Sequence, residues 1–124
     1  MTSPLKTLDA SCSPCHTQGT AWLMERVKST QDQTFQILHM AGQNVAKAHA
    51  AIKKASETAN PDQAELAKAR ELVRKAQWFW DFVAAENSMG VHNPTQALNT
   101  AAQANELARQ AIDAANKAAG LDLM

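Results

Sequence analysis

The sequence predicts an all-α protein, a long-helix antiparallel bundle of about three helices. Alanine makes up about a fifth of the 124 residues, whereas glycine and proline number four each and tyrosine is absent. This composition favours long helices, because sheets are enriched in β-branched and aromatic residues. Apolar residues also recur at alternating spacings of three and four, the seam of helices that pack nearly parallel or antiparallel. An all-β or doubly wound fold is thereby excluded.

Two similar motifs, Asn-Pro-Asp-Gln at 60–63 and Asn-Pro-Thr-Gln at 93–96, indicate helix starts. In each, asparagine suits the N-cap, proline the first helical position and glutamine a capping box. Gly90 and Gly120 follow apolar runs and suit C-terminal stops. The helices are therefore expected at about 20–58, 61–87 and 94–119.

Each expected helix carries one apolar stripe, which we expect to form the core. The stripe residues are Leu38, Ala41, Val45, Ala48, Ile52 and Ala55 in the first helix, Leu66, Ala69, Val73, Ala76, Trp80 and Val83 in the second, and Leu98, Ala101, Asn105, Ala108, Ile112 and Ala115 in the third.

The first expected helix is too long for a compact globule. At a rise of 1.5 Å per residue it would measure about 55–60 Å. A globule of this size has a radius of gyration of about 14 Å, so one end of the helix must protrude. A second copy is the simplest partner for its apolar stripe, which predicts a homodimer through long helices. A break in the polar stretch 28–33 would shorten the helix and weaken this argument.

Size and charge limit the class of protein. The chain suits one domain over 1–124, divided into an N-terminal segment 1–19 and a helical bundle 20–119. Twelve basic and twelve acidic residues balance, which argues against nucleic acid as a partner. No apolar run approaches the roughly 20 residues that span a bilayer, so no membrane span is expected. Residues 1–10 lack the apolar region of a secretory signal.

The two cysteines lie in the string Cys12-Ser13-Pro14-Cys15-His16. C-x-x-C-H is the pattern of c-type haem attachment. Two thiols at this spacing add to the two vinyl groups of one porphyrin, and the adjacent histidine is placed as proximal iron ligand. A thioredoxin-like pair would need a βαβ pattern, and a zinc site would need four ligands, which the scattered histidines at 39, 49 and 92 do not supply at a suitable spacing.

The sequence therefore predicts one covalently attached haem c, held by Cys12, Cys15 and His16. Haem of this type is attached outside the cytoplasm. We accordingly expect a periplasmic protein, whose export signal has been removed from the chain.

Residues 76–83 (AQWFWDFV) and 85–94 (AENSMGVHNP) add a more specific signal. They resemble the C-terminal part of the ammonia-forming multihaem cytochrome c nitrite reductases, the cytochrome c552 family. That family shows AQW-x-WD running into AENS-x-G-x-H-x-P, and it places a final C-x-x-C-H before a long helix. The resemblance extends over about 10–115 and implies a haem-binding helical module.

The chain also departs from that family. The resemblance would imply further haems, with an active-site haem that has a lysine ligand and nearby arginine, tyrosine and histidine. This chain has one haem motif and no tyrosine, so no catalytic residues are assigned. We expect a one-haem relative, a mono-haem c-type cytochrome for single-electron transfer with an unidentified redox partner. The alternatives are a haem protein whose open iron binds gases or small ligands, and an excised dimerisation module of a multihaem reductase.

The sixth iron ligand is less defined than His16. The resemblance implies that the histidine matching His92 ligates a neighbouring haem, and that the last haem takes its distal histidine from upstream, where this chain has none. His92 is nevertheless the favoured candidate, because loops between rigid helices often carry ligands. The second helix would return about 40 Å along the first, and an extended loop 88–93 would add about 16 Å. His92 would then reach the level of Trp22, near the haem of its own chain or of a dimer partner.

An open or water-bound iron and a methionine ligand remain alternatives. Bis-histidine ligation would favour a low potential, and methionine would raise it. The methionine candidates are Met24, Met40 and Met89, of which the first two are interpreted mainly as core residues. His39 and His49 are interpreted as surface histidines or as histidines satisfied by other hydrogen bonds. The aromatic cluster is expected mostly in the core, with some members and Trp22 walling the haem; its residues are Trp78, Phe79, Trp80 and Phe82.

Overall fold

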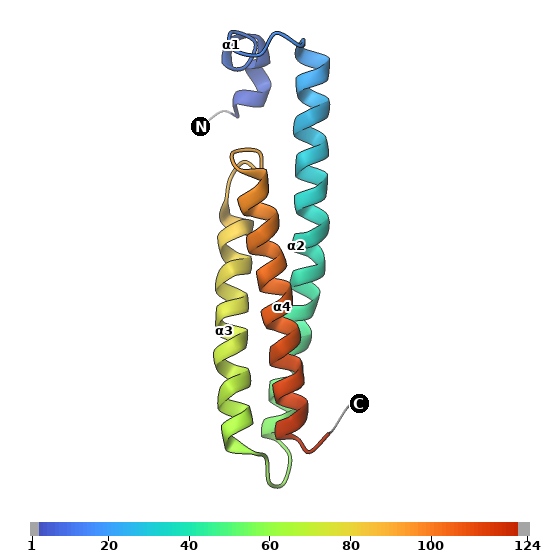
Figure 1. Cartoon of the computed structure of the whole chain (residues 1–124), viewed down its shortest axis with the longest axis vertical. Helices are drawn as coiled ribbons and strands as arrows, with labels where there is room; N and C mark the ends of the chain where they lie inside the picture. The colour runs from blue at the N-terminus through green and yellow to red at the C-terminus, as the bar shows by residue number, and fades with distance from the viewer. Residues whose placement is uncertain (1–2, 122–124) are drawn as a thin grey trace.

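The computed structural model describes residues 3–121 and confirms an all-α fold (Figure 1). Three long helices form the bundle, and two short helical turns precede them, which the sequence analysis did not separate from the N-terminal segment. The elements are η1 (Pro4–Thr7), α1 (Leu8–Ser11), α2 (Thr20–Ser56), α3 (Gln63–Ala85) and α4 (Pro94–Ala118).

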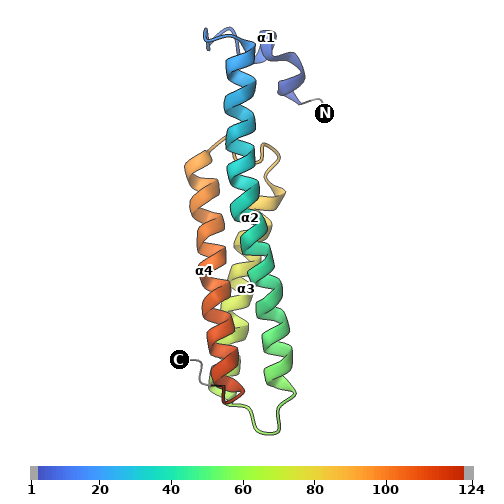
Figure 2. The same cartoon turned by 90° about the vertical axis from the view of Figure 1, so that its right-hand side faces the viewer.

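Helix α2 is unbroken over 37 residues, a length of about 55 Å. The polar stretch 28–33 contains neither glycine nor proline and does not interrupt it. α3 runs back along the C-terminal part of α2, and α4 then returns beside both (Figure 1; Figure 2). The N-terminal end of α2 thus extends beyond the bundle, as the sequence predicts. Within residues 3–121 no helix has both the length and the apolar character to cross a bilayer.

The core is built from small side chains. The predicted stripes of α2 and α3 are buried, apart from Ile52 and Trp80, which are half-buried. The prediction was wrong for part of α4, where Leu98, Asn105 and Ile112 are half-buried. The reason is that α4 packs against both other helices, and alanine lets their axes approach closely. The buried residues of α4 are Ala97, Ala101, Ala104, Ala108, Ala111, Ala114, Ala115 and Ala118.

Only one of the two predicted asparagine caps forms. Asn93 Oδ1 accepts a hydrogen bond from the backbone N–H of Gln96 at 3.0 Å and caps α4 as predicted. Asn60 does not cap α3. Asp62 does so instead, because its carboxylate accepts from the Ala64 and Glu65 N–H groups and carries the charge that a helix N-terminus favours.

The two predicted glycine stops also differ. Gly120 has φ +78°, and its N–H donates to Lys117 O at 3.0 Å, while Leu121 N–H donates to Asn116 O at 2.8 Å. This Schellman arrangement ends α4 as predicted. Gly90 does not end α3, which already stops at Ala85; it lies within the α3–α4 loop, and the reason for a glycine there is a close contact with α2, described below.

Two part-buried hydrogen bonds connect α2 with the other helices, besides an exposed contact of His49 with Gln77. The Asn44 amide donates to Asn105 Oδ1 at 2.6 Å, between α2 and α4. The indole N–H of Trp80 donates to the Leu38 carbonyl at 2.8 Å, and Trp80 lies so close to Gly42 that a Cβ there would be 2.9 Å from the indole nitrogen. Because these hydrogen bonds are directional, they favour one register of α2 against the other helices. Alanine surfaces alone would distinguish poorly between alternative registers.

Candidate functional site

Cys12, Cys15 and His16 lie together on one turn between α1 and α2. The Cys12 N–H donates to Leu8 O at 2.9 Å, and the Cys12 carbonyl accepts from the Cys15 and His16 N–H groups at 3.1 and 2.9 Å. The two cysteines are not joined in a disulfide; Cys15 and His16 are exposed and Cys12 is half-buried. A single turn therefore presents two thiols and one imidazole.

This donor set fits a covalently attached haem. The two thiols have the spacing that two vinyl groups need, and the exposed imidazole of His16 follows directly as an axial nitrogen ligand. The turn is positioned by α1, which contacts α2 beside the start of that helix (Figure 1). Gly19, with φ +97°, supplies the bend that leads from this segment into α2.

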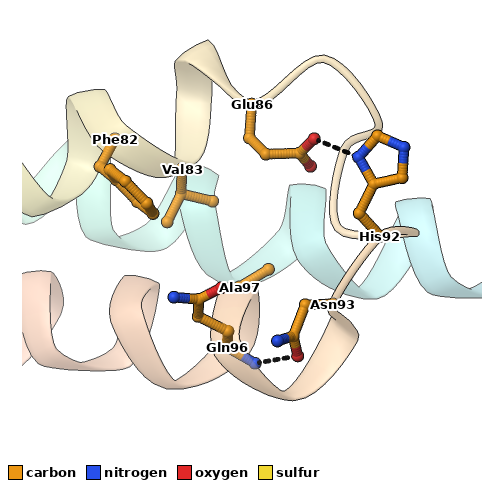
Figure 3. A pocket seen from close by; sticks show the side chains of 7 residues that line it. All are labelled: Phe82, Val83, Glu86, His92, Asn93, Gln96 and Ala97. Atoms are coloured by element: carbon orange, nitrogen blue, oxygen red, sulfur yellow. Dashed lines mark hydrogen bonds and ion pairs between the residues drawn. The ribbon is translucent and has the colours of Figure 1, made fainter.

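A second cluster of polar groups forms in the α3–α4 loop around Glu86, the C-cap residue of α3 (Figure 3). Glu86 Oε1 accepts from the Ser88 N–H at 2.9 Å and lies 3.1 Å from His92 Nδ1. Glu86 Oε2 accepts from the Ser88 hydroxyl and from the Gly90 N–H, the latter at 3.1 Å. The His92 N–H in turn donates to Ser88 Oγ at 3.0 Å.

These contacts change the acidity of Glu86. Burial alone would raise the pKa of this carboxyl, but the hydrogen bonds from Ser88, Gly90 and His92 outweigh it and lower the pKa from 4.5 to about 2. Glu86 is therefore ionised at neutral pH and acts only as a hydrogen-bond acceptor.

The same loop is attached to α2. Gln31 Nε2 donates to the Ser88 carbonyl at 3.2 Å. Gly90, at φ +92°, packs so closely on the buried Thr34 that an added Cβ would overlap the threonine hydroxyl oxygen. Met89 has a positive φ of 52°, which is uncommon for a residue with a side chain. The loop is thus fixed at the level of residues 31–34.

The structure does not bring His92 beside His16 within this chain. An extended loop would reach the level of Trp22, but the loop coils around Glu86 and stops near Gln31, about 13 Å short along α2. Figure 1 shows the Cys12–His16 segment at the far end of α2, beyond this loop. The expectation of reach within one chain was therefore wrong. His92 as an iron ligand stays a prediction.

Glu86 is the residue that the sequence analysis missed. A glutamate at the C-terminal end of a helix faces the negative end of the macrodipole, which is unfavourable unless other donors compensate. An acid at that position, followed by Asn-Ser-Met-Gly, was a signal for a carboxylate-centred loop.

The remaining ligand candidates are distributed along the bundle. His39 and His49 are exposed, as predicted, and His39 stacks on Phe35. Met24 and Met40 are exposed rather than buried. Met24 lies on the part of α2 that extends beyond the bundle, and Met40 lies outside the buried stripe of α2. Met89 is half-buried and packs against the buried cluster that contains Leu38 and Val83. None of these histidines and methionines lies on the Cys12–His16 turn.

The aromatic cluster divides into two parts. Trp80 and Phe79 are half-buried. Trp78 and Phe82 are 63% and 46% exposed and stack on each other with ring centroids 5.8 Å apart. The expectation of a mainly buried cluster was wrong for this pair, because the narrow alanine interface leaves no space for large rings between the helices.

A shallow cleft of about 110 Å³ opens between the ends of α3 and α4 (Figure 3). Its walls are mainly apolar on the helix side, where Gln96 adds a polar side chain, and polar toward the loop. Among residues 3–121 no three histidine, cysteine, aspartate or glutamate side chains gather as a metal site. The cleft is lined by Phe82, Val83, Glu86, His92, Asn93, Gln96 and Ala97.

A helical bundle whose longest helix follows a C-x-x-C-H turn is the arrangement of a c-type cytochrome. The model of the cytochrome c552 family matches residues 1–121, and the chain belongs to this family. The resemblance inferred from the sequence is thereby confirmed.

Individual relatives agree with this assignment. The chain is 43% identical to the cytochrome c nitrite reductase subunit NrfA of Nitratidesulfovibrio vulgaris, over 94% of this chain and 24% of that protein. It is 31% identical to cytochrome c-552 of Desulfotalea psychrophila, over 84% of this chain and 20% of that protein. A solved structure that matches is the NrfA catalytic subunit of cytochrome c nitrite reductase from Desulfovibrio desulfuricans, described with two calcium sites. The TM-score is 0.92 and the identity 40%, over 98% of this chain and 27% of that chain. The chain thus spans about a quarter of the length of these relatives.

Proposed function

We propose that this chain carries one haem c, attached through Cys12 and Cys15 with His16 as axial ligand, and that it transfers single electrons. The observation that supports this most directly is the single turn that presents both thiols and the imidazole at the head of α2. The bound haem supplies a one-electron redox iron. The cysteines fix its orientation, and His16 supplies one imidazole nitrogen.

Haem stoichiometry tests this proposal. The full chain, produced together with a c-type haem maturation system, should show one covalently bound haem per chain by mass and by the pyridine haemochrome spectrum. The Cys12→Ser/Cys15→Ser double variant should lose all covalent haem, whereas His39→Gln, a control at an exposed histidine, should keep it. Covalent haem in the double variant, or none in the unaltered chain, would overturn the proposal.

The second axial position distinguishes electron transfer from ligand binding. Because His92 lies far from His16 within one chain, the structure also favours the alternative of an open iron that binds small ligands. The visible spectrum of the reduced protein should stay unchanged on addition of CO if the iron is six-coordinate. A clear shift would favour the ligand-binding function instead.

We further propose that His92 ligates an iron bound elsewhere, either in a second copy or in another part of a longer multihaem chain. Its exposed ring beside an apolar cleft supports this. The chain spans about a quarter of the length of its relatives, so a module of a larger multihaem reductase is the second candidate function. The intact mass of the native protein separates these two cases.

We propose a homodimer through α2 and a periplasmic location. Large apolar side chains of α2 are exposed, including Trp22, Met24 and Phe35, and a second copy would cover them. The location is proposed because a c-type haem is attached outside the cytoplasm. Fractionation of cells that express the native gene tests it, and recovery of haem-loaded protein from the cytoplasm would contradict it.

A further inference from the structure

We propose that Glu86 is a positioning residue that holds His92 with Nδ1 protonated and Nε2 presented outward as an iron ligand. This inference rests on the proposed function, since His92 needs such an orientation only if it ligates iron. It assigns a specific task to a carboxylate that neither binds the haem turn nor contributes to the core.

The protonation of the ring follows from the contact. His92 Nδ1 lies 3.1 Å from Glu86 Oε1. An ionised carboxylate can only accept, so Nδ1 of the neutral ring must carry the proton. The lone pair then resides on Nε2, which is the nitrogen free to bind a metal. Ligating histidines commonly donate their other N–H to a carboxylate in this way.

The surroundings fix both partners of this contact. Glu86 is 28% exposed, and its oxygens also accept from Ser88 and Gly90. The backbone N–H of His92 is bound to Ser88 Oγ, so the main chain and the ring of the histidine are both held. The loop adopts positive φ at Met89 and Gly90 to reach this arrangement. Backbone strain of this kind persists where the surrounding structure enforces a defined geometry.

The histidine ring itself remains accessible. Its side chain is 71% exposed, and Figure 3 shows the second ring nitrogen directed away from Glu86 and from the helices. The apolar side chains of Phe82, Val83 and Ala97 form the helix side of the adjoining cleft. A ring that served only to close the loop would not need to expose its second nitrogen beside an apolar surface.

The tautomer of His92 is the direct test. Long-range ¹⁵N–¹H NMR spectra of the full chain, at a pH where the ring is neutral, should show the Nδ1–H form. Glu86→Ala should abolish this preference. Glu57→Gln, at the exposed C-cap of α2 and outside the loop, should keep the Nδ1–H form. An Nε2–H form in the unaltered chain, or no change in Glu86→Ala, would overturn the proposal.

A titration with a water-soluble ferric porphyrin that has an open axial position measures the consequence. His92→Ala sets the background from the other histidines. Above that background, Glu86→Ala should weaken binding at least about 10-fold, the usual effect of removing such a partner, whereas Glu57→Gln, at the exposed C-cap of α2, should not. Equal affinities for Glu86→Ala and the unaltered chain would contradict the role.

The two tests also separate this inference from the proposed function. If haem fails to attach at Cys12 and Cys15, the pyridine haemochrome shows it, and the tautomer of His92 is unaffected. If haem attaches and the tautomer is Nε2–H, the electron-transfer proposal stands and the role of Glu86 is wrong.

Discussion

At Glu86 a single carboxylate organises the α3–α4 loop, and its acidity links the loop to pH. Its pKa is lowered to about 2 in the folded chain, from the ordinary value of 4.5 that applies to the unfolded chain. The stabilisation is therefore fully present above pH 4.5 and is lost as pH falls from 4.5 toward 2, with an upper limit of about 3 kcal/mol.

We predict that Glu86→Gln removes this part of the acid destabilisation. Urea unfolding between pH 7 and pH 3 should show a smaller loss of unfolding free energy in Glu86→Gln than in the unaltered chain. Ser88→Ala should reduce the loss only in part, because Gly90 and His92 still donate to the carboxylate. Identical pH profiles for the Gln variant and the unaltered chain would show that the loop contacts do not stabilise the carboxylate.

Gly90 provides a second prediction at the residue scale. Gly90→Ala should destabilise the chain by about 2–4 kcal/mol, because positive φ and overlap with Thr34 act together. Gly120→Ala, at positive φ with open space around it, should cost only about 1–2 kcal/mol. Thermal and urea unfolding measure both. Adding Thr34→Ala to Gly90→Ala should restore part of the loss; if it restores none, the contact is not the cause.

At the scale of elements, the start of α3 offers two candidate capping residues, Asn60 and Asp62, two positions apart. Asp62→Ala should cost about 1 kcal/mol, because two backbone N–H groups lose their acceptor. Asn60→Ala should be nearly neutral, since Asn60 does not cap the helix. Urea unfolding of the two variants side by side measures the difference, and an equal loss in both would contradict the assignment of the cap.

The three long helices follow from periodicity, which is a local property of the chain. Periodicity placed Leu38, Val45 and Val73 in the core correctly. It was wrong for part of α4, where Leu98 and Ile112 have the right spacing but are only half-buried, because one face of α4 contacts two helices. Which of several equivalent stripes is buried depends on tertiary packing, and no spacing rule within one helix contains that information.

The loop 86–93 was predictable in position but not in shape. Its length alone allowed His92 to approach Trp22. The actual path is set by hydrogen bonds between Glu86, Ser88 and Gly90, and by the contact of Gly90 with Thr34. The Cys12–His16 motif, by contrast, was recognisable because its chemistry depends on spacing within five consecutive residues.

At the scale of the whole molecule, exposed apolar side chains on α2 predict self-association. Met24 and Phe35 are 40% and 57% exposed, and a separation of about three turns puts them on one side of α2. Sedimentation should show a dimer for the full chain. Met24→Glu/Phe35→Glu should yield a monomer with unchanged helix content, whereas Gln36→Glu should remain dimeric. A dimer in the double variant would place the interface elsewhere.

Because α2 is one unbroken helix, its length sets two properties of the Cys12–His16 turn together. These are the distance of the turn from the bundle and the side of the helix axis that the turn faces. Each residue between the bundle and the Cys12–His16 turn adds about 1.5 Å of reach and about 100° of rotation. One inserted residue would therefore turn both thiols toward a different side of the molecule, while seven would return them to within about 20° of the original direction. Changes in the length of this segment therefore keep the thiols on the same side only near whole numbers of helical turns, such as seven or eleven residues.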